Sequence, residues 1–160
     1  MYFIYCGYNK VRVDFVMKTE KPDIHFVNQL SPLVLAFVGD AVFNLFIRSR
    51  LVMQKKESAH MMHVRAINYV KASAQSKIVS RLHDRLNDDE KIIFRRGRNT
   101  KSATVPKHAD VLDYRRATAF EAVLGYLYLL GMHERLDEIL NMAAEIIEQE
   151  GEGPDGKKEE

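Results

Sequence analysis

The fold of this 160-residue chain is decided by the stretch LVLAFVGDAVFNLFI, residues 33–47. It is apolar almost all round, which is typical of a helix at the centre of a protein. Ser31 and Pro32 stand directly before it, as an N-cap residue and a first helical residue. We therefore predict a central helix that begins at Pro32 and ends near Met53.

A second apolar stretch, ATAFEAVLGYLYLLG at residues 117–131, resembles the first in carrying one carboxylate close to a glycine. Glu121 lies four residues before Gly125, and Asp40 directly follows Gly39. An ionised carboxylate inside an apolar helix costs several kcal/mol unless it has a partner. We therefore expect both carboxylates to be paired, and a metal ion is one such partner.

The rest of the chain also favours helices. Helical spacing of apolar residues predicts further helices over 58–86, 90–96, 110–130 and 132–148, with a new cap at Asn87 and with Gly97 and Gly131 just past two helix ends. The segment 98–108 reads as a loop, residues 1–16 read as a weak strand or no element, and no period-two pattern of any length is found. The predicted class is all-α.

The chain divides into an N-terminal extension (1–29), one helical domain (30–148) and a disordered tail (149–160). Met17 opens a natural start, so we expect translation to begin there. The single cysteine, Cys6, excludes an internal disulfide and a cysteine-based zinc site. With no convincing signal peptide and no apolar run of the roughly 18 residues that span a membrane, we expect a cytoplasmic protein.

Charge is unevenly distributed along the chain. Residues 91–116 hold eight Lys/Arg against two Asp, a net charge of +6, whereas residues 134–160 hold ten acids against three bases, a net charge of −7. Such a basic segment predicts a polyanion-binding patch. Its stretch RRGRNTKSATVPKH has no aromatic residue for base stacking, which favours backbone and shape recognition as in double-stranded RNA. The expected phosphate contacts are Arg95, Arg96, Arg98, Lys101 and Lys107, assisted by Ser102 and Thr104; the alternative is a solvated loop.

Two inward carboxylates from crossing helices suit Mg²⁺, which prefers oxygen ligands and is often held by one or two carboxylates. The small neighbours Gly39, Ala41 and Ala122 would leave room for the ion and a phosphate. The alternative is that each acid is simply neutralised, Asp40 by Arg48 or a backbone amide and Glu121 by Arg115 or Arg116. Asp110 and Asp113 either cap the following helix or add a second acidic shell.

The two carboxylate segments resemble the motifs of the ribonuclease III family. LAFVGDAVFNLFIR is similar to the family signature, roughly LEFLGDAVL, and TAFEAVLGYLYL is similar to its second segment, roughly DxFEAxxGAxYLD. With RRGRNTKS and PKHADVLDYRRATAFEA between them, the chain resembles the Mini-III branch, which has a catalytic domain and no separate double-stranded-RNA-binding domain. Ala36 and Thr118 stand where longer members have acids, a feature of this branch.

The resemblance implies a helical endonuclease domain that dimerises, forms a valley across the two subunits and cuts double-stranded RNA with Mg²⁺, leaving 5′ phosphates. Asp40 and Glu121 would be catalytic and hold the metal, whose bound water would be the nucleophile. The implied role is maturation of precursor 23S rRNA in ribosome biogenesis, with a ribosomal-protein helper as a candidate partner. Two alternatives remain: a non-catalytic double-stranded-RNA-binding dimer, which Ala36 and Thr118 favour, and a purely helical interaction protein.

Overall fold

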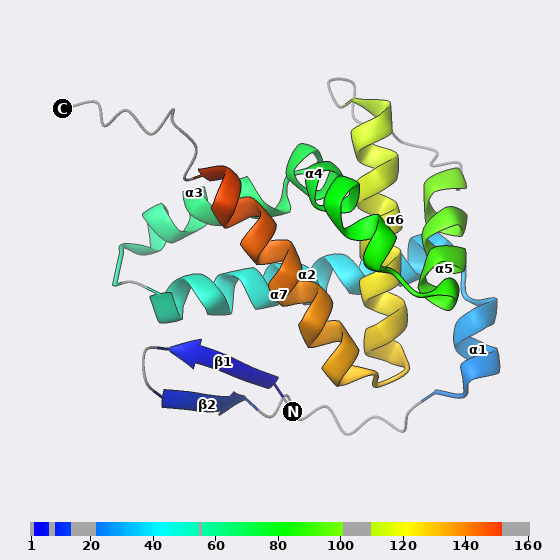
Figure 1. Cartoon of the computed structure of the whole chain (residues 1–160), viewed down its shortest axis with the longest axis horizontal. Helices are drawn as coiled ribbons and strands as arrows, with labels where there is room; N and C mark the ends of the chain where they lie inside the picture. Colours follow the sequence, from blue (N-terminus) through cyan, green and yellow to red (C-terminus); the bar gives the residue numbers. More distant parts are fainter. Residues whose placement is uncertain (1, 7–8, 14–21, 55, 101–109, 152–160) are drawn as a thin grey trace.

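A computed structural model describes residues 2–6, 9–13, 22–54, 56–100 and 110–151. The described residues form mainly helices (Figure 1). The elements are β1 (Tyr2–Cys6), β2 (Asn9–Val13), α1 (Ile24–Gln29), α2 (Pro32–Gln54), α3 (Ala59–Val70), α4 (Ala72–Leu82), the short 3₁₀ helix η1 (His83–Arg85), α5 (Asp88–Asn99), α6 (Val111–Leu129) and α7 (His133–Gly151). The predicted helical class is confirmed.

The centre of the domain is the crossing of α2 and α6, the two helices with the carboxylate motifs (Figure 1). A Cβ atom added at Gly39 of α2 would overlap the backbone carbonyl of Glu121, and one added at Gly125 of α6 would overlap the carbonyl of Leu35. Each helix therefore presents a glycine to the backbone of the other. This corrects the expectation that Gly39 leaves room for an ion, because the backbone of α6 fills that space.

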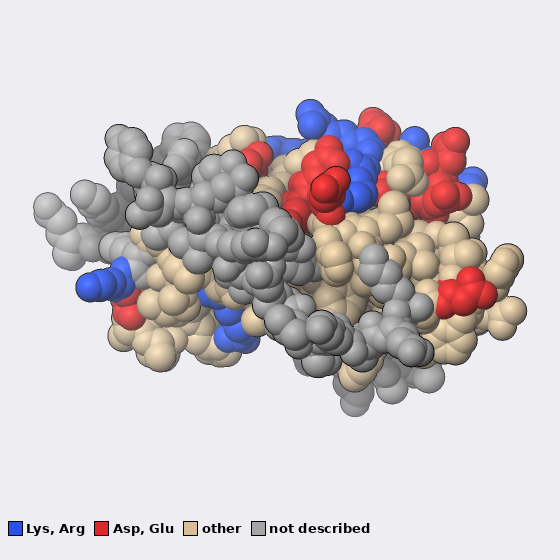
Figure 2. Space-filling model, turned by 90° about the horizontal axis from the view of Figure 1, so that it is seen from below, with Lys and Arg blue, Asp and Glu red and all other residues tan. Residues whose placement is uncertain are grey.

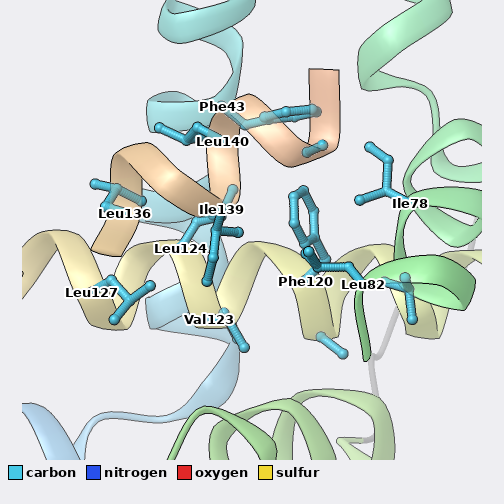
Figure 3. Packing of buried hydrophobic residues seen from close by; sticks show 14 of the residues in the cluster. Phe43, Ile78, Leu82, Phe120, Val123, Leu124, Leu127, Leu136, Ile139 and Leu140 are labelled. Carbon is cyan, nitrogen blue, oxygen red and sulfur yellow. The ribbon is translucent and has the colours of Figure 1, made fainter. Parts of the chain in front are cut away.

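Around this crossing, α4 and α7 pack on α6 and close the core (Figure 3). The rings of Phe43 and Phe120 meet edge to face, with 5.3 Å between their centroids. Leu136, Ile139 and Leu140 on α7 are fully buried, as the apolar spacing predicted. Each such side chain contributes about 1.5–3 kcal/mol of transfer free energy, so the core also fixes how the two central helices cross.

The predicted helix ends are largely confirmed. Ser31 Oγ accepts a hydrogen bond from the N–H of Val34 at the start of α2. Asn87 and Glu90 form a reciprocal capping box at the start of α5. Gly131, with a φ of 65°, follows α6 at the turn into α7. These ends are encoded locally, by side chains that satisfy the free backbone groups of the terminal turns.

The predicted helical region 58–86 is confirmed; it is divided into α3 and α4 because Lys71 takes an extended conformation (φ −63°, ψ 147°) that turns the chain. Two boundaries were predicted wrongly. α5 continues past Gly97 to Asn99, because that glycine packs on α6, where an added Cβ would lie 2.7 Å from Ala119 Cα. α7 reaches Gly151, three residues into the predicted tail.

The N-terminal extension contains two elements. Of the two readings of residues 1–16, a weak strand or no element, the strand is found: β1 and β2 form an antiparallel hairpin with Tyr2 opposite Val13. β1 lies against α2 and α7. α1 begins at an Asp23 cap and was not predicted. Met17 lies outside the described residues, and the translation start stays a prediction.

By length and composition, α2 could cross a membrane, and 28% of its most apolar window is buried within this chain. Core helices of soluble proteins pass the same test. Its close packing against α6 accounts for its apolar character on one side.

Candidate functional site

The α2–α6 crossing brings Asp40 and Glu121 together. Gly39, directly before Asp40, lies against the backbone carbonyl of Glu121 itself. The two carboxylates are close enough that the negative charge of Asp40 contributes to raising the pKa of Glu121. The sequence-predicted pair is thus one site, positioned by glycine-mediated contact between two rigid helices.

Glu121 is in an unfavourable place for a negative charge. Burial, with a smaller contribution from the Asp40 charge, raises its pKa from 4.5 to about 7. A hydrogen bond from Gln75 Nε2 to Glu121 Oε1, 2.9 Å long, acts in the opposite direction but only partly offsets the burial. The raised pKa means that Glu121 keeps its proton to a higher pH than an exposed glutamate does.

Asp40 differs from the expectation that both acids are buried. It is exposed at the surface of the chain, where Asn44 Nδ2 donates to its Oδ1 at 2.8 Å. Asp40 and Asn44 are four residues apart and so lie on the same side of α2. The cost of burying a charge accordingly falls on Glu121 alone.

The simple neutralising partners are not found among the described residues. Neither carboxylate has a Lys or Arg within ion-pair distance there. Arg116 Nη1 instead donates to Ser76 Oγ at 3.3 Å, while Arg48 and Arg115 are exposed. Within the described part of the chain, the two neighbouring carboxylates are therefore not compensated by a basic side chain.

The positions that lack acids relative to longer family members are buried in this chain. Ala36 is 6% exposed, and Thr118 is 7% exposed and donates its hydroxyl hydrogen to the carbonyl of Tyr114. Asp110 caps α6 by accepting from the N–H groups of Leu112 and Asp113, which confirms capping. These positions add no third carboxylate to the pair.

The donor set fits a hydrated Mg²⁺. Within the described part of the chain, no three or more His, Cys, Asp or Glu residues gather in a way that could hold a metal. Two carboxylates alone suit an ion that keeps several of its waters. Gln75 adds a buried side-chain oxygen, Oε1, that has no hydrogen-bond partner there. Carboxylate oxygens are ligands that Mg²⁺ prefers. A cation would favour the charged form of Glu121, whose pKa is raised mainly by burial and further by the charge of Asp40.

Of the residues predicted to hold phosphates, the structure describes only the three arginines of α5. Arg95 and Arg98 are exposed on α5, and Arg95 lines a shallow pocket with His83 and Lys91. Arg96 is engaged elsewhere: its guanidinium donates to the carbonyls of Asn28 and Leu30, at 3.2 and 2.9 Å, and so fastens α1 to α5.

The remaining predicted contacts, Lys101, Ser102, Thr104 and Lys107, lie outside the described residues. On the face shown in Figure 2, blue and red side chains are interspersed along one edge and much of the described surface is neutral. The described residues on that face therefore form no continuous basic patch.

Comparison with known proteins shows which family the chain belongs to. The Ribonuclease III domain family matches residues 33–132, which include both carboxylates. The chain belongs to the ribonuclease III family. It is 49% identical over 140 residues to the Mini-ribonuclease 3 of Thermoanaerobacter sp. (strain X514), covering 88% of this chain and 99% of that protein. It is 45% identical to the Mini-ribonuclease 3 of Clostridium tetani, covering 77% and 82%.

A solved structure has a similar fold. Protein FN1578 from Fusobacterium nucleatum superimposes with a TM-score of 0.68 at 33% identity, covering 74% of this chain and 95% of that one. The resemblance to the Mini-III branch is therefore confirmed, and the chain is an endoribonuclease of the ribonuclease III family.

One residue at the site of this ribonuclease III domain was missed. Gln75 is 1% exposed and contacts Glu121, although its helix was predicted only from apolar residues. A signal was present: Gln75 shares the helix face of Ile78, Val79 and Leu82, so it is a polar residue on an apolar stripe. Such a residue needs a buried hydrogen-bond partner.

Proposed function

We propose that this endoribonuclease cleaves double-stranded RNA with Mg²⁺, as a homodimer in the cytoplasm, during maturation of precursor 23S rRNA. The observation that carries the catalytic part is the pairing of Asp40 with Glu121 at the α2–α6 crossing. Phosphodiester hydrolysis needs positive charge at the scissile phosphate, and a pair of uncompensated carboxylates is a place for the cation that supplies it.

Asp40 and Glu121 would hold the Mg²⁺ ion. When bound, the ion would stabilise negative charge on the phosphate and lower the pKa of a coordinated water molecule. Asp40 faces solvent and so offers an oxygen on the side from which RNA can approach, whereas partly buried Glu121 anchors the site in the core. The hydrogen bond from Gln75 keeps one oxygen of Glu121 in place.

A dimer is supported by the outer face of α2. Phe37 is 80% exposed, and Leu33, Val34, Leu45 and Val52 are each at least 40% exposed. Large apolar patches of this kind usually mark interaction surfaces. Because Phe37 lies three residues before Asp40, the two share one side of the helix. Burying Phe37 between two copies would place Asp40 at the edge of the interface.

The dimer is tested by replacing Phe37 with Asp and measuring mass in solution by sedimentation. We expect the wild-type chain to be a dimer and Phe37→Asp a monomer. Ile92→Asp is the matched control, because Ile92 is also an exposed apolar side chain, 46% exposed, but lies on α5. A monomeric wild-type chain would contradict the homodimer.

The RNA substrate is supported by chemistry of the basic segment and by the kinship with Mini-ribonuclease 3. Exposed Arg95 and Arg98 stand at the end of α5 where the predicted phosphate-binding stretch continues. Without aromatic residues that stretch would contact phosphate and sugar, which favours a duplex over unpaired bases. The proposals of a role in rRNA maturation and of a ribosomal-protein helper rest on the family resemblance.

A cleavage assay tests the function. The purified full-length chain is incubated with a long RNA duplex in Mg²⁺ and then in EDTA, and with the corresponding single strands as the control. We expect duplex cleavage to 5′-phosphate ends in Mg²⁺ and none in EDTA. If the duplex stays intact in Mg²⁺ while the protein binds it, the chain is the non-catalytic RNA-binding module. A precursor 23S rRNA transcript would be cut at a defined position if the rRNA role is correct.

A further inference from the structure

Gln75 on α4 is one of the few polar side chains inside the core. It is 1% exposed, and both of its amide hydrogen bonds cross between elements. Its Nε2 donates to Glu121 Oε1 on α6 and to the carbonyl of Val70 at the end of α3, each at 2.9 Å. With both donor positions used, the amide cannot rotate without losing a hydrogen bond. Glu121 is thereby tied to the α3–α4 corner.

The acceptor end of the same amide is left open. Gln75 Oε1 is buried and has no hydrogen-bond partner among the described residues. Buried polar atoms are nearly always paired with protein or with ordered water. The two bonds from Nε2 fix which end of the amide is the acceptor. An unpaired acceptor on an amide that contacts Glu121 indicates a partner that brings hydrogen-bond donors to this place.

A hydrated cation brings such donors, because Mg²⁺ keeps several of its waters when carboxylates bind it. We propose that Gln75 is a positioning residue of the metal site: its amide N–H groups hold Glu121 in place, and its Oε1 accepts a hydrogen bond from the hydration shell of the ion. This inference rests on the proposed metal dependence. It assigns a role to a residue that lies outside both carboxylate motifs.

A purely structural role would also account for a buried amide between α4 and α6. The neighbouring Ser76 separates the two possibilities. It is 4% exposed, lies on the same helix, and accepts a hydrogen bond from Arg116 on α6 at 3.3 Å. Ser76→Ala therefore removes a contact between the same two helices without touching Glu121. Gln75→Met keeps similar length and volume but removes the donors and the acceptor.

The first test measures metal binding in the absence of RNA. Mn²⁺ is titrated into the full-length wild-type chain, Gln75→Met and Ser76→Ala, and free Mn²⁺ is followed by electron paramagnetic resonance. We expect Gln75→Met to weaken binding by about 10- to 100-fold, the usual effect of removing a hydrogen bond to a metal ligand. Ser76→Ala should stay within about twofold of the wild type.

Two further readouts accompany the titration. Thermal unfolding in EDTA should be similar for Gln75→Met and Ser76→Ala, and duplex binding in EDTA should be unchanged in both. Raising the Mg²⁺ concentration should recover part of the cleavage rate of Gln75→Met. A folded Gln75→Met chain that binds Mn²⁺ like the wild type would overturn the proposal.

A second test needs no change at Gln75 and applies if Gln75→Met does not fold. The side-chain amide NMR resonances of Gln75 are assigned in the wild-type chain by through-bond correlation to the backbone resonances of the same residue. Titration with Mg²⁺ should shift them with the dissociation constant measured by calorimetry, and Glu121→Gln should abolish the shift. Amide resonances that stay fixed at saturating Mg²⁺ would overturn the proposal.

The outcomes for the two proposals are distinct. A wild-type chain that binds neither Mn²⁺ nor Mg²⁺ contradicts the proposed metal dependence, and the role of Gln75 falls with it. A wild-type chain that binds the ion and cuts duplex RNA, beside a Gln75→Met chain that does both equally well, contradicts the role of Gln75 alone.

Discussion

Glu90 and Glu121 are both glutamates turned toward the interior, and their surroundings are opposite. Glu90 is 1% exposed, and Arg135 donates to both of its oxygens, Nε to Oε1 at 2.8 Å and Nη2 to Oε2 at 2.9 Å. The N–H of Asn87 donates to Oε2 as well. Among the described residues, Glu121 accepts one side-chain hydrogen bond, from the amide of Gln75, and the charge that shifts its pKa is that of another acid, Asp40.

The two glutamates differ in the charges that lie next to them. The charge of Glu90 is balanced by Arg135, and this ion pair links the start of α5 to α7. No cation balances Glu121 among the described residues, so a bound cation would recover free energy there. Burial alone does not distinguish the two glutamates; the identity of the neighbouring charges does.

The largest expected effect is on the rate of cleavage. Glu121→Gln and Asp40→Asn each keep the shape of the side chain but remove an anionic ligand. A metal ion contributes several kcal/mol of transition-state stabilisation, so either change should slow cleavage by about 10³-fold or more. The measurement is a single-turnover rate on duplex RNA in Mg²⁺.

Duplex binding in EDTA serves as the control for these two variants, and it should change little because they remove little surface. If Glu121→Gln cuts at the wild-type rate, Glu121 belongs with Glu90 as a structural residue and the proposed centre is wrong.

The next effect is on stability and concerns Glu90. Glu90→Ala leaves Arg135 without its principal partner and removes half of the capping box. Removing one member of a buried ion pair costs about 3–5 kcal/mol. We expect about 3 kcal/mol here, because Arg135 also contacts Glu138 and the carbonyl of Arg85. Urea unfolding measures the change.

The cleavage rate per folded molecule should stay close to the wild type in Glu90→Ala, measured well below its unfolding midpoint. A variant that remains stable but loses activity would reverse the two roles.

A third effect is a pH dependence of stability without metal. Because the folded chain raises the pKa of Glu121 from 4.5 to about 7, the folded state binds this proton more tightly than the unfolded state does. The free energy of unfolding should therefore fall as pH rises from about 4.5 to 7, by up to about 3 kcal/mol in total. Urea unfolding in EDTA between pH 5 and 8 measures it.

Glu121→Gln should lack this part of the pH dependence, and Mg²⁺ added at pH 8 should restore stability to the wild type but not to the variant. If the free energy of unfolding depends on pH in the same way for both chains in EDTA, the pKa of Glu121 is not raised by folding.

The smallest effect concerns the basic segment. Lys101→Ala should weaken duplex binding and lower the slope of log affinity against log salt by about one, since one phosphate contact is lost. Arg96→Ala is the contrasting variant, because Arg96 donates to the carbonyls of Asn28 and Leu30. It should lower the unfolding midpoint while leaving the salt slope unchanged. An unchanged slope for Lys101→Ala would remove Lys101 from the interface.

The sequence predicted the helices wherever local chemistry defines them. Ser31, Asn87 and Asp110 cap helices with their own side chains, and caps act within a few residues of the chain. The extent of α5 past Gly97 was mispredicted, because that glycine serves a contact with Ala119 on another helix. Local patterns carry no information about which helix packs where.

The same limit applies to the site. Asp40 and Glu121 were identified from their apolar surroundings and from the family resemblance, but the solvent exposure of Asp40 was not. Gln75 was not identified because its importance comes from a partner 46 residues away in sequence.

The sequence by itself determined the helical class, the family and the two acids, because apolar periodicity, capping residues and short motifs are properties of neighbouring residues. Only the tertiary structure decided which of the two acids has a raised pKa. That property depends on the backbone contact at Gly39 and Gly125, which sets the two carboxylates side by side, and on whether a cation lies within reach. Charge balance is a sum over neighbours in space, and the folded chain alone selects those neighbours.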